Sequence, residues 1–321
     1  MSTRIAVIGG FLGAGKTTLL TNLARKYMGE GRSVALITND QGEVLVDTQY
    51  AKDLGIETAE VLKGCFCCKF PDFIDSARRL VDTVRPDIIM AEPVGIEEEG
   101  SLGAYLRKHQ VQEAEVIVLT KMDLIASGEI SGLMGMVEEM NPGARIIPYS
   151  AVTGHGLTDI SRLIVSRDRS LKRPVGIDYE IYAQAEAELG WYNGTFSMVL
   201  PEGTDSYHLA SEMMSRVSKA YLPGEIAHVK MLLESRTNAI KMSLVFQSLG
   251  VDGVKGGRRA EGSTTINMNA RVVSAPEKLR QVMREAVLET LCDNGVTAVD
   301  FKDDCFSPGR PDPTYRMADG E

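Results

Sequence analysis

The sequence contains little that would suit a secreted, membrane-bound or nucleic-acid-binding protein. It has only five cysteines in 321 residues, and three of them fall within four positions, so a disulfide framework is not indicated. No apolar run approaches the roughly 20 residues of a membrane span, and the first ten residues lack the apolar stretch of a secretory signal. The 35 lysines and arginines are outnumbered by 44 aspartates and glutamates, and a net charge of −9 disfavours binding to a phosphate backbone. We therefore expect a cytoplasmic protein that binds neither membranes nor nucleic acid.

What is present is typical of an ordinary globular chain. Hydrophobic residues make up 44% and charged residues 25% of the sequence, and the length suits about two domains. A polar, basic stretch that ends in Pro174 separates two parts of different character. We predict an N-terminal domain over 1–166, a linker over 167–174 and a C-terminal domain over 175–321.

Short β-branched runs alternate with helical stretches in the N-terminal domain. Continuous apolar strands separated by helices predict an α/β domain in which helices cover both faces of a parallel sheet. The strands are expected at 4–8, 34–38, 87–91, 116–120 and 145–148, with a weaker strand at 60–62, and the helices at 16–27, 72–84, 129–140 and 157–165.

The C-terminal domain has a different order of elements. Its pattern predicts a smaller α+β domain with an antiparallel sheet and helices on one face, close to a ferredoxin-like plan. A hairpin is expected to turn at 191–194, and a loop is expected at 254–263. The strands are expected at 179–185, 195–200, 227–233, 239–246, 264–273 and 298–301, and the helices at 206–221 and 276–291.

The strongest motif lies near the N-terminus, where residues 10–17 fit the pattern G-x-x-x-x-G-K-[ST]. Glycines leave the backbone N–H groups of such a loop free to surround a phosphate. Lys16 adds a positive charge toward the β- and γ-phosphates, and Thr17 offers its hydroxyl to Mg²⁺. An apolar strand precedes the motif and a helix follows it, as a P-loop requires. The predicted phosphate-binding residues are Gly10, Gly13, Ala14, Gly15, Lys16 and Thr17.

Two later segments indicate which base is bound. Asp123, in Thr120-Lys121-Met122-Asp123, can accept hydrogen bonds from both N1–H and the N2 amino group of guanine, a donor pair that adenine lacks. Lys121 would lie over the base plane, and Thr120 stands where guanine-nucleotide proteins more often carry asparagine. A second segment begins at Ser150, and the N–H of Ala151 could donate to guanine O6. The predicted base-binding residues are Thr120, Lys121, Asp123, Ser150, Ala151 and Val152.

Acidic segments follow two other predicted strands. Asp40 and Glu92 are candidates to bind Mg²⁺ or its waters, and Gly95 is the candidate to sense the γ-phosphate. Together with Lys16 they form the predicted catalytic set. The alternative is that one of these acids only caps a helix.

A cluster of cysteines, Gly64-Cys65-Phe66-Cys67-Cys68, follows the weak strand. Thiolates select Zn²⁺, Cu⁺ or similar soft ions, and the three thiols leave a fourth ligand to come from elsewhere. Glu43 is our candidate because its segment leaves a neighbouring strand. The alternatives are buried, inert cysteines or a redox couple.

The segments GGFLGAGKTTLL, NDQGEVLVD, GCFCC, EPVG and TKMDL, in this order, resemble the CobW-like GTPases, which are kin to the GTPases that insert nickel into hydrogenase and urease. The resemblance covers residues 1 to about 160. It implies a metallochaperone or metal-insertion GTPase, some members being linked to zinc supply and some to cobalamin. It also implies phosphate contacts from Gly13, Gly15, Lys16, Thr17 and Thr18, guanine recognition by Asp123, and metal binding by Cys65, Cys67 and Cys68 with Glu43.

The chain departs from this family pattern in three places. Asp40-Gln41 stands where the family usually has Glu-Phe. So few residues separate Gly95 from Thr120 that a strand and a helix common in the family are expected to be missing. The C-terminal half shows no clear match to the usual second domain and has no histidine-rich stretch.

Three functions remain open at this stage. The leading one is a GTPase, with GTP, Mg²⁺ and Zn²⁺ or another soft divalent ion, that couples nucleotide state to delivery of a metal or metal cofactor to a client protein. The second is a GTP/GDP switch with structural cysteines. The third is a P-loop ATPase or kinase that acts in corrinoid protein activation. The sequence leaves open which metal and client are involved and whether nucleotide drives formation of a homodimer.

Overall fold

The computed structural model describes most of the two halves of the chain. The described residues are 3–11, 13–40, 52, 55–62, 66, 69–93, 108–166, 189–245 and 247–307. The chain divides into two compact units, and each is considered by itself. The described part of the N-terminal unit lies within residues 3–40 and 55–166, and that of the C-terminal unit is almost entirely residues 189–307. No helix among the described residues is both long and apolar enough to cross a membrane.

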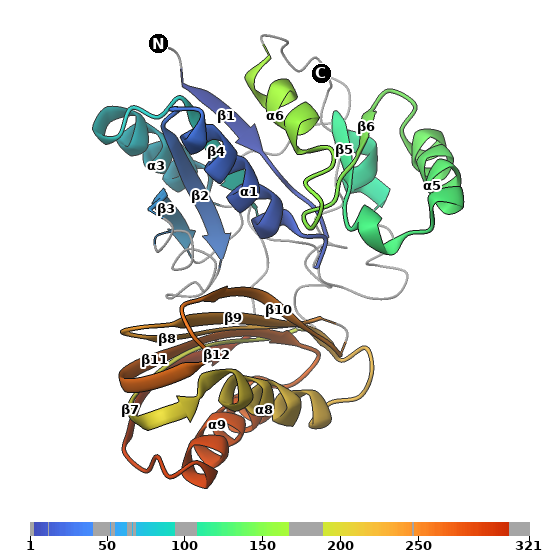
Figure 1. Cartoon of the computed structure of the whole chain (residues 1–321). Coiled ribbons are helices and arrows are strands. Elements are labelled where there is room, and N and C mark those ends of the chain that lie inside the picture. The colour runs from blue at the N-terminus through green and yellow to red at the C-terminus, as the bar shows by residue number, and fades with distance from the viewer. Residues whose placement is uncertain are drawn as a thin grey trace. The chain divides into compact units, whose positions relative to one another are not determined.

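A parallel sheet of four strands forms the centre of the N-terminal unit (Figure 1). The spatial order is β1 (Arg4–Val7), β4 (Ile88–Glu92), β2 (Val34–Asp40) and β3 (Glu57–Leu62). Every residue of β4 is buried, which fits a strand that is covered on both faces and explains its continuous apolar sequence. The weak strand that the sequence predicts at 60–62 is confirmed, because these residues lie in β3.

Helices cover the two faces of this sheet, as predicted. Alternate residues of β2 and β4, among them Ile37 and Ile89, form one apolar cluster with Phe73 and Leu80 of α3 (Phe70–Thr83). The other face packs against α1 (Lys16–Gly29), whose apolar side chains other than Met28 are almost completely buried.

The remaining strands of this unit form a separate parallel pair, β5 (Val116–Leu119) and β6 (Arg145–Pro148). Among the described residues, β1 pairs only with β4, so the two parallel sheets do not join. The described residues do not test the expectation that a strand and a helix before Thr120 are missing, because residues 94–107 lie outside them; residues 108–113 are helical. The pair is accompanied by the short helix η1 (Met122–Leu124), α5 (Ser127–Met140) and α6 (Leu157–Val165).

Side-chain contacts link this pair of strands to the rest of the unit. The Tyr27 hydroxyl on α1 donates to the Ser161 carbonyl on α6 at 2.8 Å. The Asn22 amide on α1 donates to the Tyr149 hydroxyl just after β6 at 2.9 Å. Burial raises the pKa of Tyr149, an effect that the hydrogen bond from Asn22 partly offsets, so the phenol stays protonated near neutral pH.

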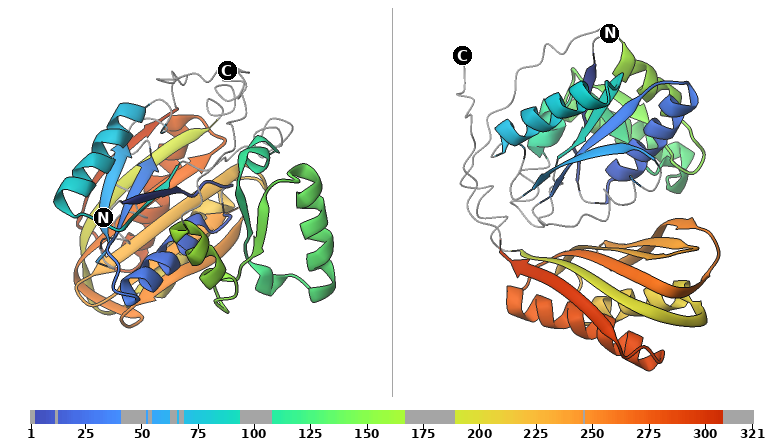
Figure 2. Two further views of the ribbon diagram at one scale, coloured as in Figure 1. Left: turned by 90° about the horizontal axis from the view of Figure 1, so that it is seen from above. Right: turned by 90° about the vertical axis from the view of Figure 1, so that its left-hand side faces the viewer.

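The C-terminal unit is a six-stranded antiparallel sheet with the spatial order β10-β9-β8-β11-β7-β12. The strands β12, β7, β11 and β8 and the two helices have the connectivity of a ferredoxin-like fold, so the predicted plan is confirmed; β9 and β10 are added at the edge next to β8. Figure 2 shows both helices on the same face of the sheet. The elements are β7 (Gly190–Asp205), α8 (Ser206–Lys219), β8 (Ile226–Ser235), β9 (Ala239–Val245), β10 (Ser248–Lys255), β11 (Arg259–Val272), α9 (Pro276–Asp293) and β12 (Val299–Phe306).

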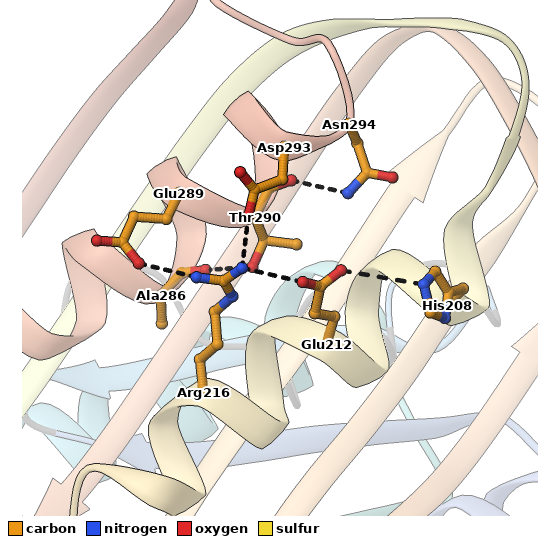
Figure 3. A network of polar contacts seen from close by, with 8 residues as sticks. All are labelled: His208, Glu212, Arg216, Ala286, Glu289, Thr290, Asp293 and Asn294. Atoms are coloured by element: carbon orange, nitrogen blue, oxygen red, sulfur yellow. Dashed lines mark hydrogen bonds and ion pairs between the residues drawn. The ribbon is translucent and has the colours of Figure 1, made fainter.

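The two helices are held to each other and to the sheet. Their inner faces form one apolar core with the sheet, in which Met213 of α8 and Met283 of α9 are fully buried. On the outside, Arg216 of α8 joins three carboxylates (Figure 3): Nη2 lies 3.0 Å from Glu212 and 2.6 Å from Asp293, and Nη1 lies 2.8 Å from Glu289. One guanidinium thus connects both helices.

Two expectations for the C-terminal unit were wrong. The segment 191–194 is no turn but lies within β7, where Trp191 pairs with Arg271 of β11 and Phe306 of β12. The segment 254–263 is no loop, because β10 extends to Lys255 and β11 begins at Arg259. Asn-Gly is a strong local turn pattern, but at Asn193-Gly194 pairing with neighbouring strands decided the outcome. Gly256-Gly257 do form a turn, a short one between β10 and β11. The strand predicted at 179–185 lies outside the described residues.

Candidate functional site

The carboxyl ends of the parallel strands meet at one edge of the N-terminal sheet. Residue Val7 of β1 pairs with Ala91 of β4, and Asp40 at the end of β2 pairs with Leu62 at the end of β3. The segments that leave these strands therefore start from the same edge, which is where open α/β sheets bind ligands. The predicted phosphate, magnesium and metal segments all begin there.

The phosphate-binding loop has the backbone that its glycines allow. Gly13 and Gly15 have φ values of +68° and +83°, in the left-handed region that side chains disfavour. Gly15 caps the N-terminus of α1, which places the positive end of the helix dipole at the loop. The Lys16 ammonium donates to the carbonyls of Gly10 and Phe11, each at 3.1 Å, so it lies over the loop rather than in the core.

The structure brings together the two predicted magnesium residues whose side chains it describes. The Thr17 hydroxyl donates to the Glu92 carboxylate, 3.0 Å from Oε1 and 3.3 Å from Oε2. Glu92 is 9% exposed, so a carboxylate is held beside the loop at the end of β4. Two oxygen ligands at this spacing fit a small hard cation such as Mg²⁺, which favours carboxylate and hydroxyl oxygens. The side chain of Asp40 and the whole of Gly95 lie outside the described residues.

The two predicted base-reading segments also meet. The Ser150 hydroxyl donates to Asp123 Oδ1 at 2.6 Å and accepts from the N–H of Thr153 at 3.1 Å. Ser150 is 2% exposed, whereas Asp123 is exposed, so a buried hydroxyl fixes a carboxylate at the surface. The remaining carboxylate oxygen and the exposed Ala151 can then face a planar base.

The backbone around these residues is specialised. Lys121 has a φ of +58° and caps η1, two residues before Asp123. Gly156, with a φ of +79°, begins α6 where a side chain would collide with the Pro148 carbonyl. Val152 is 82% exposed in the turn that follows Ser150, as single apolar side chains often are on protein surfaces.

Thr120 has a contact that the sequence did not predict. Its hydroxyl donates to the Ala14 carbonyl of the phosphate loop at 2.8 Å. Sequence reasoning also missed Asn22 and Tyr149, which connect α1 to the base-reading segment. The local sequence gave no indication for Asn22, which lies beside Arg25 and Lys26 on α1.

The predicted soft-metal ligands Glu43, Cys65, Cys67 and Cys68 lie outside the described residues. Among the residues that the structure does describe, no three His, Cys, Asp or Glu side chains are grouped so as to hold a metal ion. The strands before the ligands are nevertheless in register: Asp40 pairs with Leu62, and Glu43 and Cys65 each follow three residues later. The Asn39 amide donates to the Val61 carbonyl at 2.9 Å and fixes this register.

The parallel sheet, the loop with Lys16 and the Thr17–Glu92 pair define a P-loop nucleotide-binding protein. Within that class, residues 4–106 match the family described as "CobW/HypB/UreG, nucleotide-binding domain", and this segment of the chain is similar to that family. The resemblance inferred from the sequence motifs is thereby confirmed.

The relatives are similar over only part of their length. The zinc chaperone CobW of Sinorhizobium sp. is 39% identical over 98 residues, which cover 28% of this chain and 27% of that protein. The zinc-regulated GTPase metalloprotein activator 1 of Dictyostelium discoideum is 23% identical over 236 residues, 49% of each chain. This chain thus spans about a quarter to a half of the length of these relatives. The solved hydrogenase maturation factor HypB of Archaeoglobus fulgidus is 20% identical, covers 50% of this chain and 88% of its own, and has a TM-score of 0.39.

Proposed function

We propose that this protein is a GTPase whose nucleotide state controls the binding of a soft metal ion, Zn²⁺ in the first place, and its delivery to a metal-requiring client protein. The observation that carries the proposal is the common edge of the parallel sheet, where the phosphate loop, the Thr17–Glu92 pair and the segments with the predicted metal ligands all begin. The names of the relatives, a zinc chaperone and a zinc-regulated GTPase, agree with it.

The phosphate side of the site supports GTP hydrolysis. Lys16 would move from the Gly10 and Phe11 carbonyls to the β- and γ-phosphates, and the loop N–H groups would surround the β-phosphate. Thr17 and Glu92 would hold Mg²⁺, which neutralises charge that develops on the transferred phosphoryl group. We assign Asp40 to a water or Mg²⁺ contact and Gly95 to the γ-phosphate. Charges placed in advance at the phosphates are the main source of rate acceleration in such sites.

The base side favours guanine over adenine. Asp123, fixed by Ser150, accepts from N1–H and the N2 amino group, and an N–H at Ala151 donates to O6. Adenine has an amino group where guanine has O6 and no N1–H, so both contacts would be lost. This argues for a GTPase over an ATPase or kinase.

The metal side follows from the register of β2 and β3. Neighbouring strands lie about 4.8 Å apart, and three further residues span at most about 10 Å. Glu43 and the thiolates of Cys65, Cys67 and Cys68 can therefore converge on one tetrahedral ion, the usual geometry of zinc with sulfur and oxygen ligands. Only two residues separate Glu43 from Asp40, so a movement of Asp40 on GTP binding would carry a metal ligand with it.

A metal titration in two nucleotide states tests the proposal. Zinc affinity is measured by competition with a chromophoric chelator, once with GDP and once with a non-hydrolysable GTP analogue, each with Mg²⁺. We expect one ion per chain and an affinity difference of about 5- to 150-fold between the two states, the usual range of coupling between sites. Because coupling is reciprocal, zinc must change the affinity for the GTP analogue by the same factor.

Two variants make the test specific. Replacing Cys65, Cys67 and Cys68 together by serine should abolish tight zinc binding, while Cys292→Ser, which changes an exposed cysteine of α9, should leave it intact. Equal zinc affinity in both nucleotide states would reduce the protein to a nucleotide switch with structural cysteines. A preference for ATP over GTP would favour the kinase or ATPase instead.

A further inference from the structure

Helix α5 differs from the other helices of its unit in how little of it is covered. Its sequence is rich in apolar residues, yet none of them is buried. Figures 1 and 2 show α5 at the outside of the β5–β6 pair, with no other described helix or strand of the unit against its outer side. A surface helix normally presents charged residues to solvent, as α3 does with Asp75, Arg78 and Arg79. The apolar outer side of α5 therefore needs another explanation.

The apolar residues of α5 form two stripes. One stripe, which includes Met134, is partly buried in a helix that contacts β6. The other consists of Leu133, Met136 and Met140, which are 37%, 63% and 41% exposed. Spacings of three and four residues place these three side chains on one side of the helix. Single exposed apolar residues are common, whereas exposed apolar residues gathered in one place mark an interaction surface.

The charge along this exposed stripe is entirely negative. Glu129 lies four residues before Leu133 on the same side of the helix, and Glu139 lies three residues after Met136. The helix contains no lysine, arginine or histidine, so no cation of α5 compensates these carboxylates. A partner that covers the stripe must therefore bring positive charge to its border.

Glycines leave one flank of the stripe open. Gly128, Gly132 and Gly135 recur at spacings of four and three residues, and Gly132 is four residues before Met136. Beyond the local helix backbone, no atom lies within 4 Å of the position that a Cβ atom would take at any of these glycines. A row without side chains beside a row of large ones makes the groove and ridge by which two helices pack. The surface therefore fits a helix.

We propose that α5 is a docking surface for a basic amphipathic helix of another protein, whose apolar face covers Leu133, Met136 and Met140 and whose cations lie against Glu129 and Glu139. Methionine suits such a surface, because its flexible side chain adapts to its partner. A second copy of this chain would bring like charges together, and the chain as a whole carries −9. The surface includes no residue assigned to nucleotide or metal, so it goes beyond the proposed function.

Binding of a labelled synthetic peptide to the full chain, followed by fluorescence anisotropy, tests the proposal. The peptide has about 18 residues, or five helical turns, with leucines along one helical face and lysines at all other positions. We expect this peptide to bind, and the same peptide with glutamates in place of the lysines not to bind. Binding should weaken as the salt concentration rises, because the charges lie at the surface.

Variants of the chain show whether the peptide binds at α5. Met136→Gln should weaken binding about 5-fold or more, the loss typical of a central interface residue. Val199→Gln is the matched control, because Val199 is also apolar and 70% exposed but lies on β7. Glu129→Lys combined with Glu139→Lys should lose the basic peptide and gain the acidic one, which a purely structural role of α5 would not give. GTP affinity should stay unchanged in all of these variants.

The proposal is overturned if the basic peptide does not bind, if the acidic peptide binds equally well, or if Val199→Gln loses as much binding as Met136→Gln. Self-association of the wild-type chain that Met136→Gln abolishes would assign the stripe to a second copy instead. Should Met136→Gln fail to fold, the charge reversal must still exchange the preference between the two peptides. A chain that binds the peptide but not GTP would keep the docking surface and refute the proposed function, and the converse result would do the opposite.

Discussion

Lys16 shows what a single side chain contributes before any nucleotide is bound. Its ammonium rests on two backbone carbonyls of the phosphate loop and lies at the N-terminal end of α1. We expect Lys16→Ala to lower GTP turnover by about 100-fold or more, because a preorganised charge on the transferred phosphoryl group is lost. Lys26→Ala, which breaks a surface ion pair with Glu30 on the same helix, is the control and should hydrolyse GTP normally. Steady-state phosphate release is the measurement, and a fully active Lys16→Ala would remove the P-loop assignment.

Asp123 is the second residue whose substitution tests the site, through its effect on nucleotide affinity. With Ser150 bound to one carboxylate oxygen, Asp123→Asn would present an amide to the base. We expect GTP affinity to fall roughly 10- to 100-fold, the worth of hydrogen bonds to a charged group. Affinity for xanthosine triphosphate should rise relative to GTP, because xanthine has a carbonyl where guanine has its amino group. Asp159→Asn on the surface of α6 provides the control, and a variant that still prefers guanine would show that Asp123 does not read the base.

At the scale of elements, β12 is joined to α9 by a polar contact at the edge of the apolar core. Arg284 donates to both oxygens of Asp303, each at 2.7 Å, and the Tyr192 hydroxyl on β7 donates to Asp303 at 3.2 Å. Burial would raise the pKa of Asp303, but the hydrogen bonds and charge of Arg284 outweigh it, and the pKa lies below its usual value.

This lowered pKa predicts how stability depends on pH. The carboxylate stabilises the fold fully above its unfolded pKa of about 3.9, and the contribution is lost as the pH falls through the lower folded value. We expect Asp303→Asn to reduce the free energy of unfolding by about 1–3 kcal/mol at pH 7, and the deficit to shrink between pH 5 and pH 2. Denaturant titrations at several pH values measure it. A deficit that does not change with pH would show that charge at Asp303 is unimportant.

The strands and helices also show how much of the fold could be predicted from the sequence. Apolar periodicity was enough to predict the parallel strands, the helices around them and even the weak strand β3, because burial on two faces leaves a continuous pattern. It did not predict β10. It failed at Trp191–Gly194, where the Asn-Gly pair indicated a turn. In the structure Gly194 lies in mid-strand, where a Cβ atom would come within 2.8 Å of ring carbons of Tyr192. The glycine thus serves packing, which is a requirement that the local sequence does not reveal.

The candidate site also contains residues that the sequence could predict and contacts that it could not. The residues that make up local motifs, such as Lys16, Thr17 and Asp123, could be named from spacing alone. The partners of these motifs could not, because Ser150–Asp123 and Thr120–Ala14 join segments that lie 27 and 106 positions apart. Thr120 was recognised as a departure from the usual motif, but only its position beside Ala14 explains what a threonine can do there.

For the molecule as a whole, each unit has an apolar core of its own among the described residues. The core of the C-terminal unit contains residues from all of its strands except β10 and from both of its helices, and the cluster around Phe73 lies wholly in the N-terminal unit. Chains built from two such units generally unfold in more than one transition. We expect calorimetry of the full chain to resolve two transitions that respond to different changes.

GTP and the helix-capping variant Asp205→Ala should each shift the midpoint of a different transition. GTP at 100 times its Kd should stabilise the N-terminal unit by about 2.7 kcal/mol, because it binds only the folded state, and should leave the second transition in place. Asp205 caps α8 by accepting from the N–H of His208 at 3.0 Å, so Asp205→Ala should lower only the second transition, by about 1 kcal/mol, at unchanged GTP affinity. A single transition that responds to both GTP and Asp205→Ala would contradict this prediction, because it would mean that the two units unfold together.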